Sequence, residues 1–272
     1  MVYADNNATT AVAPEVFEAM RPFLETVFFN PSAMYDQARP AADALDTARG
    51  QVAEVLGGVS PGEIVFTSGA TESNNTAIRG AAAATPKRRH IITSAVEHPA
   101  VREVCFAMER NGYEVSSIPV NQRGELDMDA YVRALRDDTL LVTIMHANNE
   151  TGVIFPVADI ARIAKETDPG ILVHTDATQA VGKIPLDLTQ NFKAVDLLSL
   201  SGHKCHAPKG VGALFVRRGT RCRPFMVGGH QENSRRAGTE NVASIVALGA
   251  ACELAQQRLP DENRVAALRD RL

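Results

Sequence analysis

The sequence predicts an α/β fold, a doubly wound and mostly parallel sheet of seven strands. Short apolar runs alternate with helical patterns from about residue 60 onward, and this alternation is typical of parallel sheets whose crossovers are helices. The turn at Lys209-Gly210 is too short for such a crossover. It therefore predicts that the last strand runs antiparallel to the strand before it.

Each predicted strand is a short apolar run, and the seven runs cover residues 63–66, 90–94, 113–118, 140–145, 171–175, 196–200 and 211–216. Helical patterns between them cover residues 73–84, 99–111, 128–135 and 156–167. Ser73 is a candidate N-cap, and Pro99 and Pro156 stand at first-turn positions, where helices tolerate proline. Helices at 14–27 and 38–56 precede this core, and an alanine-rich helix at 241–259 follows it.

Composition and charge limit the possible functions. The chain has 272 residues, with 28 lysines and arginines against 32 aspartates and glutamates, so its formal net charge is −4 and nucleic-acid binding has no support. No apolar run approaches the roughly 20 residues that cross a bilayer, and no secretory signal is visible. The four cysteines form no CxxC pair, which favours free thiols in a reducing cytoplasm.

A lysine and an aspartate carry the strongest chemical signal. Asp176 follows the apolar run at 171–175 and Lys204 follows the run at 196–200, so both stand at carboxyl ends of predicted strands, where open α/β sheets collect their chemistry. An aldehyde cofactor with a basic ring nitrogen needs an amine for a Schiff base and a carboxylate that keeps the ring protonated. The pair therefore indicates a site for pyridoxal phosphate.

Three more segments follow predicted strands, and each has a structural and a functional interpretation. Residues 67–73 could form an ordinary turn or a phosphate cradle, and neither is favoured because the segment lacks a Walker lysine and a GxGxxG motif. His98 could cap a helix, or it could stack on a flat ring and transfer protons. Asn148 and Asn149 could serve a turn or donate a hydrogen bond to a cofactor oxygen.

A metal site is the rival interpretation of the residues around Lys204. The candidate ligands are His203, Cys205, His206 and Cys222. Their spacing fits no structural zinc pattern, so we expect no metal at this site.

These segments together carry a family resemblance. The matching motifs are residues 3–10 (YADNNATT), 66–73 (FTSGATES), 97–101 (EHPAV), 147–152 (ANNETG), 176–182, 201–212 and 228–241. In this order they resemble the cysteine desulfurases of the NifS type, which belong to the class-V aminotransferase family of fold-type-I pyridoxal-phosphate enzymes. The resemblance covers practically the whole chain and is highly specific.

The resemblance implies a cytoplasmic homodimer that takes sulfur from L-cysteine, leaves alanine, and passes the sulfur to an iron–sulfur scaffold protein, in the NifS branch for nitrogenase clusters. It implies that Lys204 forms the Schiff base and removes the substrate Cα proton, that His98 stacks on the ring, and that Asp176 pairs with the ring nitrogen. Asn149 and Gln179 would lie near the phenolic oxygen. The implied phosphate ligands are Ala70, Thr71, Ser201, His203 and Thr239 of the partner subunit.

The sequence departs from the family pattern at its C-terminal end. The family's sulfur nucleophile is a cysteine in a C-terminal serine- and glycine-rich loop, and neither this loop nor the following substrate-carboxylate arginine is present in the 272 residues. The helical pattern at 261–272 has no stop signal, so we expect a C-terminally truncated chain. The expected parts are an N-terminal segment at 1–13, a cofactor-binding large domain at 14–259 and, at 260–272, the start of a linker helix to an absent small domain.

Three alternatives stay open at this point. Selenocysteine lyase and cysteine sulfinate desulfinase use the same scaffold, and the loop that discriminates them is not in this sequence. The third alternative is a non-catalytic fragment that binds pyridoxal phosphate. We expect the chain as written to bind the cofactor but not to sustain sulfur transfer.

Overall fold

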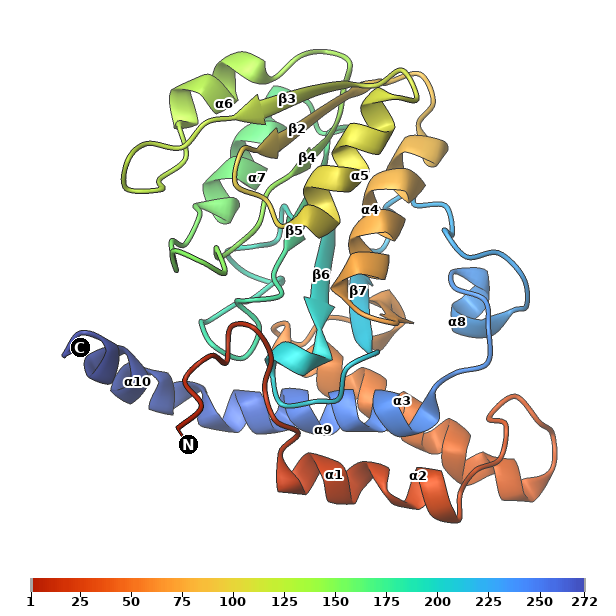
Figure 1. Cartoon of the computed structure of the whole chain (residues 1–272). Helices are drawn as coiled ribbons and strands as arrows, with labels where there is room; N and C mark the ends of the chain where they lie inside the picture. Colours follow the sequence, from red (N-terminus) through yellow and green to blue (C-terminus); the bar gives the residue numbers. More distant parts are fainter. Residues whose placement is uncertain (1, 272) are drawn as a thin grey trace.

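The computed structural model describes residues 2–271, which build one seven-stranded sheet with helices around it (Figure 1). The strands are β1 (Ile64–Thr67), β2 (His90–Ser94), β3 (Glu114–Ile118), β4 (Thr139–Thr143), β5 (Leu172–Asp176), β6 (Leu197–Ser201) and β7 (Gly212–Val216). Their order across the sheet is β1-β7-β6-β5-β4-β2-β3. β7 runs antiparallel to both of its neighbours, and the other pairs are parallel. The mostly parallel sheet and the antiparallel last strand are therefore confirmed.

Helices cover both faces of the sheet because successive strand residues point to opposite sides. Ile91 and Leu141 pack with α4 (Ala70–Ala84) and α5 (Pro99–Glu109), which contact each other on one face (Figure 1). The next residues along the same strands, Ile92 and Val142, belong to the larger core on the other side. That core includes α7 (Val157–Thr167), while the short α6 (Met128–Ala134) packs beside β3.

Two long helices cross below the sheet in Figure 1, α3 (Arg39–Val55) and α9 (Val242–Arg258). They approach so closely that a Cβ added at Gly249 would lie 2.7 Å from the Cα of Ala48, which explains a glycine in the middle of α9. α1 (Pro14–Met20) also packs on α9. The helix predicted at 261–272 corresponds to α10 (Glu262–Arg269), and residue 272 lies outside the described residues.

Three local predictions were wrong. The helix predicted at 14–27 is two helices, α1 and α2 (Pro22–Glu25), because Pro22 has no N–H to continue the helical hydrogen bonds. Ser73 does not cap α4, which begins three residues earlier after Gly69; instead the Ser73 hydroxyl shares a 2.8 Å hydrogen bond with that of Thr67. Pro156 is the N-cap of α7 rather than a residue of its first turn.

The strand directions bring the chemical motifs to one edge of the sheet. β1 and β6 are both antiparallel to β7, so β1 points the same way as β2, β4, β5 and β6. The segments that follow these five strands therefore meet where the strands end. Within residues 2–271, no helix combines the length and the apolar character that crossing a membrane requires.

Candidate active site

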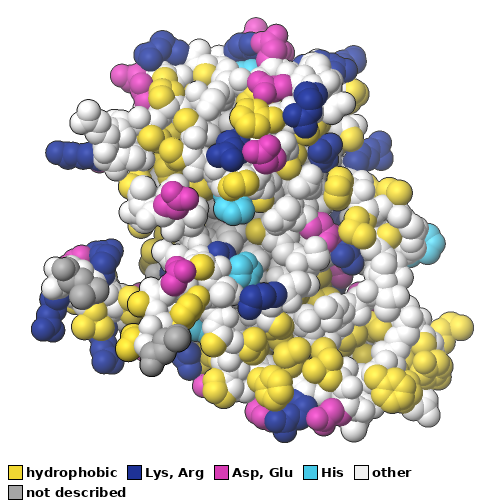
Figure 2. Space-filling view, viewed as in Figure 1, with side chains coloured by type: hydrophobic (Ala, Val, Ile, Leu, Met, Phe, Trp, Pro, Cys, Tyr) yellow, Lys and Arg dark blue, Asp and Glu magenta, His cyan; other side chains and the backbone are white. Residues whose placement is uncertain are grey.

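A pocket of about 760 Å³ lies at this edge, and we call it the sheet-edge pocket. Figure 2 shows histidine and charged side chains around the hollowed middle of this face of the molecule. All but one of the cofactor-binding residues predicted from the sequence line it: Ala70, Thr71, His98, Asn149, Asp176, Gln179, Ser201, His203 and Lys204. The exception is Thr239.

Lys204 ends the short 3-10 turn Gly202–Lys204 that follows β6, and it is partly buried beside the N-terminal loop. Its Nζ donates hydrogen bonds to the backbone carbonyls of Asn7 and Ala8, the latter at 2.8 Å. Burial lowers the pKa of the amine, while Asp5 and Asp176 act in the opposite direction. A lowered pKa brings the amine closer to the neutral form that attacks an aldehyde.

Asp176 is the last residue of β5 and is buried. Its Oδ2 accepts a hydrogen bond from Nδ2 of Asn74 in α4 (2.7 Å), and its Oδ1 accepts one from the N–H of Thr178 (3.0 Å). Each carboxylate oxygen keeps acceptor capacity for another donor. Asn74 was missed in the sequence because it lies inside a helical pattern and meets Asp176 only through the packing of α4 against β5.

The start of α4 forms an anion cradle. The helical hydrogen bonds begin with the Ser73 N–H, which donates to the Gly69 carbonyl (3.1 Å), so the N–H groups of Ala70 and Thr71 have no acceptor within the helix. Gly69 has a φ of 146°, which favours glycine and turns the chain from β1 into the helix. The helix dipole adds positive potential at this end. This geometry suits a phosphate group, which is the functional interpretation of residues 67–73.

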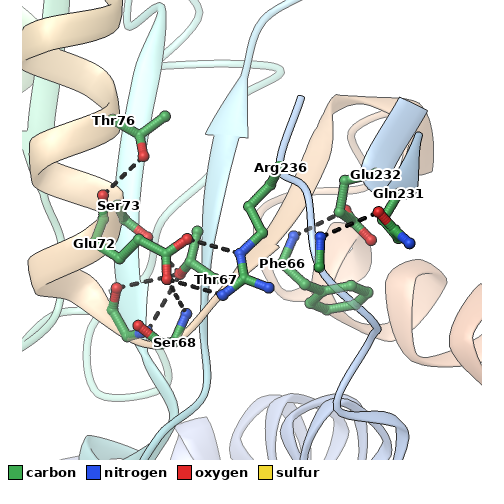
Figure 3. Close-up of polar contacts among 11 residues, drawn as sticks. Phe66, Thr67, Ser68, Glu72, Ser73, Thr76, Gln231, Glu232 and Arg236 are labelled. Atoms are coloured by element: carbon green, nitrogen blue, oxygen red, sulfur yellow. Dashed lines mark hydrogen bonds and ion pairs between the residues drawn. The ribbon is translucent and has the colours of Figure 1, made fainter. Parts of the chain in front are cut away.

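An ion pair neutralises the acidic side chain beside this cradle. Arg236 Nε donates to Glu72 Oε1 (2.8 Å), and the N–H of Ser68 donates to Glu72 Oε2 (2.8 Å) (Figure 3). Burial alone would raise the pKa of Glu72, but the hydrogen bonds from Arg236 and Ser68 outweigh it and the pKa is lowered. Glu72 is therefore ionised and paired, and its charge does not face an incoming anion uncompensated.

The loop that carries the paired arginine is anchored by a buried glutamate. Glu232 Oε1 and Oε2 each accept a 2.7 Å hydrogen bond from Arg49, and Oε2 also accepts one from the N–H of Phe66 (2.9 Å), the contact drawn in Figure 3. Glu232, Asn233 and Ser234 have φ values of 50°, 56° and 63°, a left-handed conformation that is unfavourable for residues other than glycine. The buried ion pair thus holds a strained turn in place.

His98 is a helix cap, and its predicted role of stacking on a flat ring stays a prediction. It caps α5, because its Nδ1 accepts a hydrogen bond from the N–H of Ala100 (3.1 Å), and it also lines the sheet-edge pocket. With Nδ1 as an acceptor, a neutral ring carries its proton on Nε2. The cap therefore fixes which nitrogen is available as a donor.

Glu97, directly before His98, is a buried acid for which no role was predicted from the sequence. Its Oε1 accepts hydrogen bonds from the Ser94 hydroxyl (2.6 Å) and from the N–H of Met145 (2.9 Å), which joins the segment after β2 to the segment after β4. Its Oε2 has no hydrogen-bond partner among the described residues. Burial raises the pKa of Glu97 to about 8 against the effect of these hydrogen bonds, so the side chain is mostly protonated at neutral pH.

The two neighbouring asparagines lie in different surroundings. Asn148 serves the turn, since its Oδ1 accepts hydrogen bonds from the N–H groups of Glu150 and Thr151, both at 2.9 Å. Asn149 lines the sheet-edge pocket, where its side chain can reach a ligand.

Thr239 lies outside this pocket. It is exposed and lines a second cavity of about 220 Å³, which shares Ser68 and Gly210 with the sheet-edge pocket. The resemblance assigns Thr239 to the phosphate site of a partner subunit, so its position in a single chain is compatible with that role.

The rival interpretation of the residues around Lys204 was a metal site. Within residues 2–271, no three His, Cys, Asp or Glu side chains are grouped so that they could hold a metal ion. Cys205 is buried, and its Sγ donates to the carbonyl of Gly202 (3.3 Å), whereas the Sγ of Cys222 lies 3.4 Å from the carbonyl of Thr76 in α4. No cysteine of the described chain lines the sheet-edge pocket.

Comparison with known proteins agrees with this site. Residues 2–267 match the family described as Aminotransferase class-V. The chain is 53% identical over 272 residues to Cysteine desulfurase 2 of Trichormus variabilis and 51% identical over 272 residues to Cysteine desulfurase NifS of Azotobacter vinelandii. Each alignment covers 100% of this chain and 67% of the relative.

Solved structures show the same similarity. A structure titled NIFS-LIKE PROTEIN has a TM-score of 0.93 at 43% identity, covering 96% of this chain and 71% of that one. A structure titled SspA in complex with cysteine has a TM-score of 0.88 at 41% identity, covering 93% of this chain and 72% of that one. The chain therefore belongs to the class-V aminotransferases and, within them, to the cysteine desulfurases, pyridoxal-phosphate enzymes that transfer sulfur from L-cysteine to an acceptor.

Proposed function

We propose that the sheet-edge pocket holds pyridoxal phosphate, with Lys204 as its Schiff-base lysine and Asp176 as the partner of its ring nitrogen. One observation carries the proposal: the ends of the adjacent strands β5 and β6 place both side chains in a single pocket whose wall includes the first turn of α4. The proposed cofactor-binding domain is residues 14–259.

Unsatisfied polar groups in the pocket fit this ligand. Thr178 lines the pocket, and its Oγ1 is buried without a hydrogen-bond partner among the described residues. The carboxylate of Asp176 keeps acceptor capacity for a protonated ring nitrogen. The N–H groups of Ala70 and Thr71 have no helical acceptor and can donate to a phosphate oxygen.

The pocket residues divide the work of the reaction. When bound, pyridoxal phosphate supplies an aldehyde for a Schiff base and a ring that takes up electrons. Asp176 would hold a proton at the ring nitrogen, and the amine of Lys204 would remove the substrate Cα proton. His98 would face the ring and offer the N–H of Nε2. The first turn of α4 would bind the phosphate through the N–H groups of Ala70 and Thr71.

The proposal extends to L-cysteine as the substrate of this chain and to a homodimer in which Thr239 of each subunit completes the phosphate site of the other. The relative whose title names a complex with cysteine supports the substrate, and the exposed position of Thr239 beside the second cavity supports the dimer. Similarity to NifS of Azotobacter vinelandii supports an iron–sulfur scaffold protein as acceptor and a role in nitrogen fixation. The four free thiols support a cytoplasmic location.

The thiol that receives the sulfur is, in this proposal, none of the four cysteines of the chain. Cys105, Cys205 and Cys252 are buried, and Cys222 packs against α4. Burial raises the pKa of the Cys105 thiol to about 12 and that of the Cys222 thiol to about 11, which disfavours the nucleophilic thiolate at both positions.

The test incubates L-cysteine in D₂O with the chain reconstituted with pyridoxal phosphate. NMR then measures how fast the Cα proton of L-cysteine exchanges for deuterium. This step needs the cofactor, Asp176 and Lys204, but no sulfur-accepting thiol. We expect exchange well above that given by the same concentration of free pyridoxal phosphate, and we expect Lys204→Ala to abolish the excess. Exchange no faster than with free cofactor would contradict the proposal.

A further inference from the structure

We infer that Lys183 is a positioning residue that fixes the side-chain amide of Gln179, so that the amide presents N–H rather than C=O toward the pocket. Lys183 does not itself line the sheet-edge pocket, whereas Gln179 does. What the oriented amide does to a cofactor oxygen rests on the function proposed above; the orientation itself is a property of the chain alone.

Hydrogen bonds at both ends of the amide determine its orientation. Lys183 Nζ donates to Gln179 Oε1 (2.7 Å), and Gln179 Nε2 donates to the backbone carbonyl of Asn7 (2.9 Å). An ammonium group has donors only, and a backbone carbonyl is an acceptor only. A flipped amide would therefore place N–H against an ammonium and C=O against a carbonyl, two repulsive contacts in place of two hydrogen bonds.

The turn before Lys183 packs against α9. Gly182 has a φ of 75°, and a Cβ at this position would lie 2.6 Å from the Cβ of Ala255, so glycine lets this turn pack directly against α9. Lys183 is partly buried there, and burial lowers the pKa of its amine, with Lys204 acting in the same direction. Among the described residues, Gln179 Oε1 is the one hydrogen-bond acceptor of its ammonium group.

Lys183 is linked to Lys204 through the side-chain amide of Gln179 and the backbone carbonyl of Asn7. The carbonyl of Asn7 accepts from Gln179 Nε2 and also from the Nζ of Lys204. If Lys183 no longer held Oε1, the amide could rotate away from Asn7, and the loop that contacts the Schiff-base lysine would lose one of its anchors. Lys183 thus reaches the site by hydrogen bonding through Gln179.

Three variants separate this role from general stability. Lys183→Met keeps length and apolar contact but removes the donors, and Lys183→Arg keeps donors. Gln179→Ala removes the amide, so Lys183→Met should add little in that background if the lysine acts through Gln179. Thermal unfolding of each variant shows whether the fold is retained.

The first measurement uses the chain without cofactor, labelled with ¹⁵N-glutamine. The side-chain NH₂ signals that disappear in Gln179→Ala belong to Gln179. We expect Lys183→Met to speed their hydrogen exchange about threefold to tenfold, the effect of losing one oriented hydrogen bond, and Lys183→Arg to restore wild-type exchange. Unchanged exchange in Lys183→Met would overturn the inference whether or not the chain binds pyridoxal phosphate.

The second measurement is the affinity for pyridoxal phosphate, read from its visible absorbance band. We expect Lys183→Met to weaken binding about threefold to tenfold in the wild-type background and less than twofold in Gln179→Ala. An equal loss in both backgrounds would contradict action through Gln179. A wild-type chain that does not bind pyridoxal phosphate would refute the proposed function, and the exchange experiment would still decide the role of Lys183.

Discussion

Asn74 of α4 donates a 2.7 Å hydrogen bond to the carboxylate of Asp176 at the end of β5. The helix whose first turn forms the anion cradle therefore also holds the carboxylate that faces the ring nitrogen in the proposed complex. The same helix would therefore contact the cofactor's phosphate and hold the partner of its ring nitrogen.

Loss of this hydrogen bond should destabilise the fold. Asn74→Ala leaves Asp176 Oδ2 buried with one partner fewer, and we expect the free energy of unfolding to fall by about 1–3 kcal/mol. Urea denaturation measures the change. Asn75→Ala is the matched control on the same helix, since Asn75 hydrogen-bonds only near the surface, to Thr71 and Arg79. Equal losses in the two variants would refute a special role for Asn74.

Glu97 should make stability depend on pH. Its folded-state pKa of about 8 lies above the ordinary value of 4.5, so the folded chain binds one proton more than the unfolded chain between these pH values. Stability then falls as pH rises through this window, by up to about 1.4 kcal/mol per pH unit from this group. Glu97→Gln removes the ionisable carboxyl group but keeps a neutral side chain of similar shape.

We therefore expect the unfolding free energy of Glu97→Gln to rise relative to that of wild type as pH increases from about 5 to 8. Above pH 8 the two pH profiles should run parallel. Denaturation curves across this range provide the measurement. Glu103→Gln, at an exposed position on α5, should leave the wild-type profile unchanged. A Glu97→Gln profile parallel to wild type throughout would show that Glu97 is ionised in the folded chain.

The strained turn at 232–234 predicts that one substitution stabilises the protein. Ser234 has a φ of 63°, and Ser234→Gly should raise the free energy of unfolding by about 1 kcal/mol because glycine adopts this conformation without steric penalty. Ser60→Gly is the control, for which we expect the free energy of unfolding to fall. Ser60 has a φ of −63° and forms a capping box with Glu63 at the start of a short helix. No gain from Ser234→Gly in thermal unfolding would mean that the turn is not strained.

The pair formed by Glu72 and Arg236 should control phosphate affinity. Arg236→Gln leaves the carboxylate of Glu72 uncompensated beside the anion cradle, and we expect affinity for pyridoxal phosphate to fall about tenfold by charge repulsion. The double variant Glu72→Gln/Arg236→Gln should recover most of that loss. Arg79→Gln, further along α4, controls for net charge. A double variant as weak as Arg236→Gln would refute the electrostatic explanation.

Much of the fold could be predicted because the local signals agree. Each of the seven strands is a short apolar run that ends within two residues of its predicted limit. The Lys209-Gly210 turn was sufficient to predict the antiparallel β7. The broken helix at Pro22 and the early start of α4 at Ala70 were missed, because helix limits depend on which N–H groups find acceptors in three dimensions.

The candidate site was predictable where a residue follows a strand and hidden where tertiary packing creates the contact. Lys204 and Asp176 stand at strand ends, so the topology rule locates them. Asn74 lies inside a helix and Glu97 beside a helix cap, and their partners Asp176 and Met145 are 102 and 48 residues away in the sequence. Neither periodicity nor spacing reports such contacts.

The central claim is that Lys204 forms a Schiff base with pyridoxal phosphate in the sheet-edge pocket. The direct measurement is reduction of the reconstituted chain with borohydride, followed by peptide mass spectrometry, with Lys204→Ala and Lys209→Ala in parallel. Lys209 lines the same pocket and is the matched control. We expect a single major adduct on Lys204, retained in Lys209→Ala and lost in Lys204→Ala. An adduct mainly on Lys209, or one spread over surface lysines, would contradict it.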